Sequence, residues 1–376
     1  MRNKVKVIIF IAFMYFITML SIFSKDKSFS DNENRYLATK PKFTFEKLNN
    51  GSYAKEYEEY ITDQFILRDK WISIKTYSER AMLKKDINGV YFGKDDYLIE
   101  KYEGFNEEQV NKNINRLNEF ISTYNKKIGE NHVKVMIVPT ASEVLKDKLP
   151  LFAYDNTQKR LISYINNVLP EGTTIDLISL FENYKDEYIY YRTDHHWTSL
   201  GAYYAYKKWG QEVNIETYNS SDFYIEEVSS DFYGTIYSKV NTKVKPDSIH
   251  LYNLKDKNIE YKLDYDLGQK VTDSIYDFKK LEGKDKYAVF LGGNNGLVNI
   301  KTNVGNNRKL LIIKDSFANS FIPFVINNFS EVSVVDFRYY NMKISEYIEK
   351  ENFTDILFLY NSLNFNKDKN LIKLSY

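Results

Sequence analysis

The C-terminal part of the chain alternates short apolar runs with segments of helical spacing, and this alternation limits the possible folds most strongly. Runs rich in Val, Ile, Leu and Phe cover residues 310–313, 332–335 and 356–360. Segments 317–328 and 342–350 separate them and place apolar residues at helical intervals. Parallel strands need connections of this length, because the chain must return to the starting edge of the sheet. The pattern predicts βαβ units with right-handed crossovers, and therefore a three-layer α/β/α sandwich with a parallel sheet.

The same alternation begins further upstream. A helical stripe over 110–124 precedes an apolar run at 133–138, and a second stripe over 161–168 precedes a strand-like run at 173–178. The stretch from about 214 to 281 departs from this rhythm, because it is polar, rich in tyrosine and strand-like only in short pieces. We interpret this stretch as a lobe inserted into the α/β domain.

The N-terminus carries a membrane signal. An uncharged run, residues 7–24, follows three basic residues and is long enough to cross a bilayer. Basic residues stay on the cytoplasmic side, so the pattern predicts a single-pass protein of the cell membrane with an extracytoplasmic body. A cleaved signal peptide is the alternative, but Phe23 stands where a cleavage site needs a small residue. We therefore expect a transmembrane helix within residues 1–24 that remains as an anchor.

The remaining chain divides into two further parts. Residues 25–87 begin as a polar stalk and continue with apolar residues at mixed helical spacings, which predicts a small helical subregion. Turn signals at Asn88-Gly89 then mark the start of the body. The body domain is expected to span 88–376 and to contain the insertion at about 214–281.

Composition excludes several classes of function. Among 376 residues, 52 Lys and Arg balance 51 Asp and Glu, so no excess of cations is present to bind nucleic acid. The chain has no cysteine, which excludes thiol nucleophiles and thiolate zinc sites. Aromatic residues are abundant, with 33 Tyr and 25 Phe. Aromatic rings stack on sugars, although packing in the core is the simpler account of so many.

The sharpest local motif is Asp194-His195-His196-Trp197. In an extended segment Asp194 and His196 point to one side and His195 to the other. A carboxylate that accepts from one imidazole nitrogen leaves the other nitrogen as a base. Two alternatives remain open. The Asp–His pair can simply precede a helix capped by Thr198 with Trp197 in the core, or the cluster can bind a metal, which adjacent histidines on opposite sides suit poorly.

A base requires a nucleophile, and Ser316 stands at a predicted switch from strand to helix. Unpaired backbone N–H groups at such a switch point toward incoming negative charge, which suits an exposed hydroxyl and an oxyanion hole. Ser316 can equally be an ordinary helix cap. The glycine-rich loop 292–296 offers Asn294 and the backbone of Gly293 to an oxyanion, with a tight turn as the alternative.

Two further polar residues follow predicted strands. Arg338 comes soon after the run at 332–335, and Asn361 comes directly after the run at 356–360. Ligands of open α/β sheets bind beyond the carboxyl ends of the strands. Arg338 and Asn361 are therefore candidate substrate contacts, with capping of the sheet as the alternative.

These motifs together resemble the DHHW proteins, which are SGNH-hydrolase-like and related to the alginate O-acetyltransferases AlgJ and AlgX. The resemblance is carried by Glu33-Asn34-Arg35, Asn88-Gly89-Val90-Tyr91-Phe92-Gly93-Lys94, Thr193-Asp194-His195-His196-Trp197-Thr198, Lys314-Asp315-Ser316-Phe317-Ala318-Asn319 and Val335-Asp336-Phe337-Arg338-Tyr339-Tyr340. SGNH hydrolases usually place the serine before the Asp–His pair. Here the pair comes first, as in the AlgJ-like branch.

The resemblance implies that Ser316 is a nucleophile, His196 its general base and Asp194 the orienting carboxylate. It also implies an SGNH-hydrolase-like fold and transfer of acetyl groups to cell-surface polysaccharide, with an acyltransferase of the MBOAT class as a possible membrane partner. We expect neither a metal nor a cofactor. A carbohydrate acetylesterase with the same three residues and a non-catalytic, glycan-binding scaffold for a membrane acyltransferase remain the alternatives.

Overall fold

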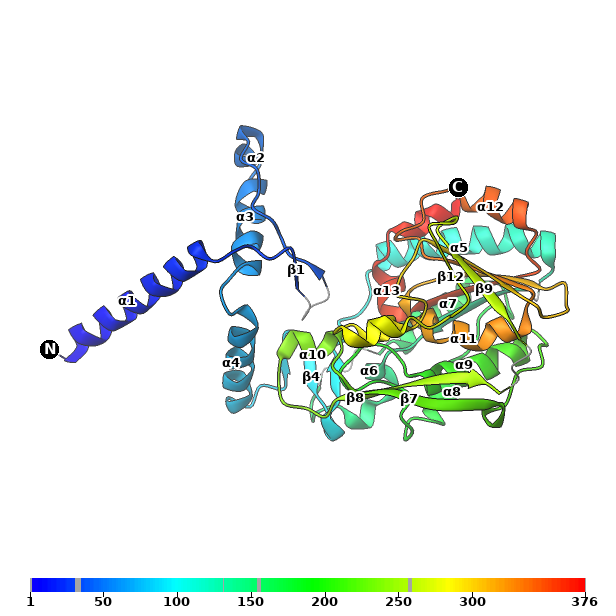
Figure 1. Cartoon of the computed structure of the whole chain (residues 1–376), viewed down its shortest axis with the longest axis horizontal. Helices are drawn as coiled ribbons and strands as arrows, with labels where there is room; N and C mark the ends of the chain where they lie inside the picture. Colours follow the sequence, from blue (N-terminus) through cyan, green and yellow to red (C-terminus); the bar gives the residue numbers. More distant parts are fainter. Residues whose placement is uncertain (1, 31–34, 131, 154–156, 256–258, 376) are drawn as a thin grey trace. The chain divides into compact units, whose positions relative to one another are not determined.

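The chain forms two compact units in the computed structural model (Figure 1), which describes residues 2–30, 35–130, 132–153, 157–255 and 259–375. The first unit comprises Met1–Asn88 and Tyr237–Lys243, and the second comprises Gly89–Ile236 and Val244–Tyr376. Glu33 and Asn34, which belong to the motifs quoted above, lie outside the described residues.

The first unit begins with the apolar helix α1 (Arg2–Phe23). Its segment Asn3–Phe23 has a mean hydropathy of 2.3 and none of it is buried in the protein. Within the described ranges, this is the helix whose length and composition allow it to cross a membrane. A signal sequence near the N-terminus has the same character.

Short elements complete the first unit. They are β1 (Phe29–Ser30), β2 (Arg35–Tyr36), α2 (Phe45–Asn49), α3 (Ser52–Asp63), α4 (Arg68–Ala81) and β3 (Asp86–Ile87). Hydrogen bonds join α4 to the distant segment 237–243, among them one from the N–H of Lys243 to the hydroxyl of Tyr77 at 3.2 Å. Ser73 Oγ donates to the carbonyl of Asn241 at 2.7 Å, and Arg80 Nη1 donates to Thr242 Oγ1 at 3.1 Å. These bonds explain why that segment groups with the N-terminal helices.

A seven-stranded sheet forms the centre of the second unit, in the order β10-β9-β11-β13-β12-β14-β6. Its strands are β6 (Val133–Val138), β9 (Tyr261–Tyr265), β10 (Lys270–Thr272), β11 (Leu297–Thr302), β12 (Lys309–Lys314), β13 (Glu331–Val335) and β14 (Asp355–Asn361). The strands β13, β12, β14 and β6 are parallel, as the apolar runs predict. Their carboxyl ends therefore meet at one edge of the sheet.

The prediction of a parallel sheet is wrong for the other three strands, so the sheet is mixed. The strand β11 is antiparallel to both β13 and β9, and β9 is antiparallel to β10. Connection lengths explain the difference. Residues 266–269 join β9 to β10, and residues 303–308 join β11 to β12. Both connections are too short for the crossover that parallel strands require, so β10 runs antiparallel to β9, and β11 runs opposite to β12 and hence antiparallel to β13.

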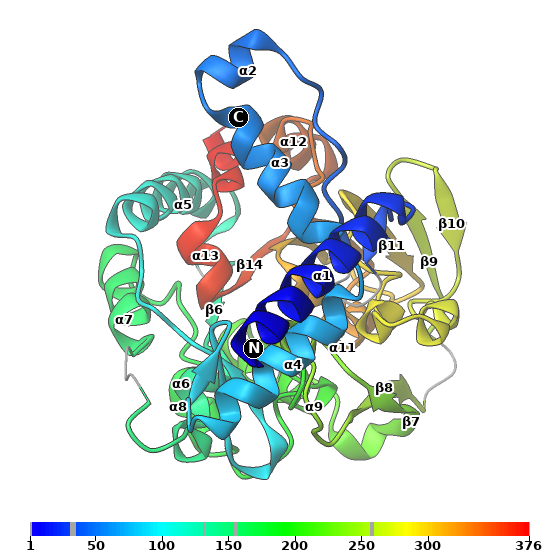
Figure 2. The same ribbon diagram turned by 90° about the vertical axis from the view of Figure 1, so that its left-hand side faces the viewer.

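Each face of the sheet carries its own apolar core, because side chains of a strand alternate between faces. In β12, Leu310 and Ile312 enter one cluster, and Leu311 and Ile313 enter the other. Helices pack on both faces (Figures 1 and 2): α6 (Ala141–Val144), α8 (Ile178–Glu182), α9 (Ser199–Glu212) and α11 (Ile322–Val325) on the first, α5 (Glu107–Ile128), α7 (Lys159–Val168), α12 (Ile344–Glu351) and α13 (Ser362–Lys367) on the second.

The segment expected to form an inserted lobe, 214–281, is divided in the structure. The strands β7 (Phe223–Phe232) and β8 (Asp247–Leu254) pair with each other as a separate two-stranded sheet. The strands β9 and β10 join the central sheet instead. The strands β4 (Val90–Phe92) and β5 (Leu98–Glu100) form a hairpin, and the helix α10 (Thr235–Val240) follows β7 in the chain.

Candidate active site

The candidate serine lies at the carboxyl end of β12, where the chain enters the short 3-10 helix η6 (Ser316–Ser320). Asp315 caps this helix, because its side chain accepts from the N–H of Phe317 at 2.9 Å. The capping role that Ser316 could have taken thus belongs to Asp315. The hydroxyl of Ser316 is left for another partner.

The Asp-His-His-Trp motif lies in a loop that leads into α9. A bridge between Tyr190 and Trp197 closes the loop, and Thr198 caps α9 by accepting from the N–H of Gly201. Trp197 Nε1 donates to the carbonyl of Phe317 at 2.9 Å. This bond ties the histidine loop directly to the serine segment.

The three candidate catalytic side chains form one hydrogen-bonded chain. Asp194 Oδ1 lies 2.6 Å from His196 Nδ1, and His196 Nε2 lies 2.8 Å from Ser316 Oγ. All three residues are buried, with exposed fractions of 3%, 5% and 7% in that order. Because an ionised Asp194 only accepts, the hydrogen of His196 sits on Nδ1. Its Nε2 lone pair therefore faces the Ser316 hydroxyl.

The carboxylate of Asp194 is held by four donors. Oδ1 also accepts from the N–H of His196, while Oδ2 accepts from the N–H of Thr235 at 2.9 Å and from its hydroxyl at 3.1 Å. Burial alone would raise the pKa of Asp194, but the neighbouring rings of His195 and His196 and these hydrogen bonds hold it well below its usual range. Asp194 therefore stays ionised.

The ring of His196 lies against Tyr287, with centroids 3.8 Å apart and planes 9° from parallel. Burial and, to a smaller extent, the neighbouring His195 lower the pKa of His196 to about 4, although Asp194 acts in the opposite direction. His196 is consequently neutral near pH 7, the state a general base needs. The hydroxyl of Tyr287 also donates to the carbonyl of Ser316 at 3.1 Å.

A polar cluster extends from the strand end beside Ser316, in which Lys314, Asn319 and Asp336 are buried and Asn294 is exposed. Lys314 Nζ donates to Asn294 Oδ1 at 3.2 Å and to Asn319 Oδ1 at 2.8 Å, and it lies 3.3 Å from Asp336 Oδ2. Burial lowers the pKa of Lys314. Because Asn294 Oδ1 accepts from Lys314, its NH₂ group points elsewhere, and no described residue accepts a hydrogen bond from it. Asn294 thus keeps a free donor near the end of β12.

The other predicted contacts are placed differently. Arg338 forms a two-point ion pair with Asp336, with Nε–Oδ1 at 2.9 Å and Nη2–Oδ2 at 2.6 Å, and one third of its side chain remains exposed. The N–H of Gly293 donates to the carbonyl of Phe290 at 3.1 Å, so this amide is already used within its turn.

Asn361 is buried and hydrogen-bonded to neighbouring groups, so it does not line the surface of the site. Its Nδ2 donates to Asp315 Oδ2 at 2.6 Å, and its Oδ1 accepts from the first N–H groups of α13. Only 2% of Asn361 is exposed. The capping alternative therefore describes Asn361 best, since it fixes the aspartate beside Ser316.

Several residues of the site carry no motif that sequence reasoning could use. Thr235 and Tyr287 reach the site from segments far from both motifs. Asp247, fully buried, accepts from the N–H groups of Arg192 and Thr193 and from two hydroxyls. A lone aspartate in a polar segment gives no signal of this role, because only the fold brings it beneath the histidine loop.

The metal alternative depends on Asp194, His195 and His196, whose potential ligand atoms lie within 4.8 Å of one another. Both ring nitrogens of His196 already have hydrogen-bond partners. His195 Nδ1 lies 2.6 Å from Thr235 Oγ1. These contacts are those of a hydrogen-bonded network, and a metal ion is not needed to explain them.

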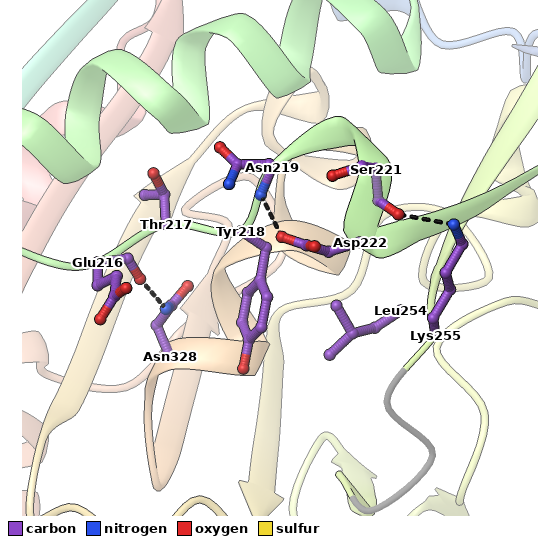
Figure 3. Close-up of a pocket in the computed structure, with 9 residues that line it drawn as sticks. All are labelled: Glu216, Thr217, Tyr218, Asn219, Ser221, Asp222, Leu254, Lys255 and Asn328. Carbon is purple, nitrogen blue, oxygen red and sulfur yellow. Dashed lines mark hydrogen bonds between the residues drawn. The ribbon is translucent and has the colours of Figure 1, made fainter.

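A polar pocket of about 530 Å³ lies elsewhere (Figure 3) and is lined by Glu216, Thr217, Tyr218, Asn219, Ser221, Asp222, Leu254, Lys255 and Asn328. Asn328 precedes β13, whereas Ser316 follows the parallel strand β12. The pocket and the serine therefore lie at opposite ends of these strands. Figure 3 also shows that Asn328 and Lys255 donate to backbone carbonyls of the pocket wall.

A serine, a histidine and an aspartate in contact at the carboxyl edge of an α/β sheet are features of the SGNH-hydrolase-like class of proteins. The chain belongs to the DHHW family: the family described as DHHW protein matches residues 85–335, more than half of the sequence. This confirms the family that the motifs predict. No protein with a curated description matches the chain.

Solved structures similar to the chain include one from the same family. A DHHW family protein from Eubacterium siraeum is 28% identical, with a TM-score of 0.64, over 77% of this chain and 96% of that one. PatB1 from Bacillus cereus is 22% identical, with a TM-score of 0.60, over 73% of this chain and 97% of that one. The O-acetyltransferase domain of Pseudomonas putida AlgJ is distant, with 13% identity and a TM-score of 0.44 over 74% and 93%.

Proposed function

We propose that the protein is a membrane-anchored, extracytoplasmic serine O-acetyltransferase that acts on cell-surface polysaccharide through an acetyl-serine intermediate. The observation that carries this proposal is the hydrogen-bonded chain from Asp194 through His196 to Ser316. The choice of acetyl group and polysaccharide rests on the resemblance of the motifs described above.

In the first step His196 Nε2 takes the proton of Ser316 while Oγ forms a bond to the acetyl carbonyl carbon. Asp194 stabilises the imidazolium that forms. The tetrahedral intermediate then collapses, the bond to the donor's oxygen breaks, and His196 returns the proton to the departing alcohol. Ser316 is left as an acetyl ester.

In the second step a sugar hydroxyl gives its proton to His196 and attacks the acetyl-serine. The bond to Ser316 breaks, and the serine recovers its proton from His196. Water in place of the sugar gives the alternative, an acetylesterase with the same machinery.

Negative charge on the tetrahedral oxygen requires donors. We assign this role to the free NH₂ group of Asn294, whose position is set by Lys314. Arg338 is the proposed substrate contact, because one third of its side chain is exposed and Asp336 fixes its direction. Gly293 and Asn361 support the same region through the backbone turn and through Asp315.

The proposed location and partners follow from the N-terminal unit. Residues 1–24 would remain as the membrane anchor, residues 25–87 as stalk and helical subregion, and residues 88–376 as the SGNH-hydrolase-like domain. The apolar helix α1 and the boundary between Asn88 and Gly89 support this division. The acetyl group would be supplied across the bilayer by a membrane acyltransferase of the MBOAT class.

The test compares wild type with Ser316→Ala for acetyl release from an activated ester and for acetyl transfer to a polysaccharide. Ser179→Ala, a change at an exposed serine of α8, is the matched control. We expect Ser316→Ala to lose both activities and the control to retain them. Equal rates in wild type and Ser316→Ala would contradict the proposed enzymatic role of Ser316 and favour a non-catalytic, glycan-binding scaffold.

A further inference from the structure

The mechanism above leaves His195 unused, although it stands in the middle of the motif. Its side chain is 28% exposed, whereas those of its neighbours Asp194 and His196 are almost completely buried. Nδ1 of His195 lies 2.6 Å from Thr235 Oγ1, and the same oxygen lies 3.1 Å from Asp194 Oδ2. A continuous chain of short contacts therefore leads from His195 to the carboxylate of the proposed triad.

The chemistry of this chain decides where the hydrogens lie. The hydroxyl of Thr235 has one hydrogen, and an ionised Asp194 can only accept. Thr235 must therefore donate to Asp194 and accept from an N–H at Nδ1 of His195. If Thr235 instead donated to His195 Nδ1, its Oγ1 would lie 3.1 Å from Asp194 Oδ2 with no hydrogen between these two oxygens. His195 thus carries its hydrogen on Nδ1 in both its neutral and its charged form.

His195 also packs on the ring of His196. The centroids of the two histidine rings lie 3.8 Å apart, the same separation as between His196 and Tyr287. Tyr287 is nearly parallel to His196 and covers one face of it. Two rings cannot occupy one face at that distance, so His195 covers the other face. Rotation of the base is therefore blocked from both sides.

We propose that His195 is a positioning residue for the catalytic base: its Nδ1–H orients Asp194 through the hydroxyl of Thr235, and its ring holds His196 against Tyr287. This inference rests on the proposed function. Asp194 lies 3.7 Å from His195 Nδ1, and Arg338 and the phenol of Tyr287 face the network from other elements.

The position of the hydrogen can be tested without any activity. The chain has four histidines, so ¹⁵N-histidine labelling of the full-length protein gives a small set of imidazole signals. Loss of a signal in His195→Asn assigns His195. We expect protonated Nδ1 and an unprotonated Nε2 for neutral His195. A hydrogen on Nε2 with a bare Nδ1 would overturn the proposal, even if the protein had no acetyl transfer activity.

Kinetics test the consequence for the base. Two pairs of variants are compared. At position 195, Asn keeps an N–H near the place of Nδ1, whereas Gln places its amide near Nε2. At position 235, Ser keeps the hydroxyl that Val removes. We expect His195→Gln and Thr235→Val to lower kcat about tenfold, roughly the value of one hydrogen bond to a charged group, with KM nearly unchanged. His195→Asn and Thr235→Ser should retain more activity in each pair.

Thermal unfolding of each variant separates this role from a loss of folding. Equal kcat in His195→Asn and His195→Gln, at equal thermal stability, would overturn the role of the Nδ1–H. Unchanged kcat in Thr235→Val would overturn the route through Thr235. A wild-type protein without acetyl release or transfer would refute the proposed function instead, and the imidazole spectrum would still decide the hydrogen-bond chain.

Discussion

Replacement of Gly234 by alanine tests the position of Asp194 without changing any polar group. A Cβ at Gly234 would lie 2.2 Å from the Cβ of Asp194 and 2.3 Å from its Oδ2. The backbone of Gly234 does not adopt a left-handed conformation, so alanine introduces no backbone strain there. The whole effect of the change falls on the contact with Asp194.

The size of the effect follows from the distances. Ordinary contact begins at 3.4 Å, so Asp194 and position 234 must separate by about 1.2 Å. The carboxylate of Asp194 is hydrogen-bonded to Thr235 through one oxygen and to His196 through the other. Moving Asp194 away from position 234 therefore distorts both hydrogen bonds. A displacement of about 1 Å in a catalytic group costs about a hundredfold in rate, or about 2.7 kcal/mol.

The assay is acetyl release from an activated ester, measured as kcat together with thermal unfolding. Gly305→Ala is the matched control, because no atom lies within 4 Å of its new Cβ and its φ is not left-handed. We expect Gly234→Ala to lose about a hundredfold in kcat while it stays folded, and Gly305→Ala to behave as wild type. A folded Gly234→Ala with wild-type kcat would refute the reasoning that Asp194 must hold this position.

Two further predictions follow from burial. Because burial lowers the pKa of His196 to about 4, kcat/KM should fall only as the pH drops through about 4 and the base becomes protonated. A midpoint near 6.5, the ordinary value for histidine, in the pH profile would contradict this. Asp247→Asn should lower the free energy of unfolding by about 2 kcal/mol, because an NH₂ group would face the donors of Tyr188 or Thr193. Unchanged denaturant unfolding would contradict that role.

The fold could be predicted where burial is complete on both faces of the sheet. The runs that became β12, β13 and β14 are almost wholly apolar and are separated by connections long enough for crossovers. The strands β9 and β11 carry polar residues, and their local pattern does not state which neighbour they join. The direction of β9 and β11 depends on which strands they pair with, and these pairings form only in the folded chain.

The site divides in a similar way. The strand-to-helix switch pointed to Ser316, but the expectation of an extended segment with His195 on the opposite side from His196 is wrong, because residues 192–196 form a bend and the ring of His195 packs on that of His196. Asp194, His196 and Ser316 do meet, through a contact between segments 120 residues apart that local rules do not give. The groups that hold them, Thr235 and Tyr287, come from segments with no motif. Their roles depend on tertiary contacts, which spacing in the sequence does not encode.

The central claim is that Ser316 carries the acetyl group during the reaction. The most direct measurement is mass spectrometry of the full-length protein after brief exposure to an activated acetyl ester, with the modified peptide located by proteolysis. We predict one acetyl group on Ser316, absent from Ser316→Ala and accumulating more slowly in His196→Ala. Acetylation confined to other residues, or equal labelling of Ser316→Ala and wild type, would contradict it.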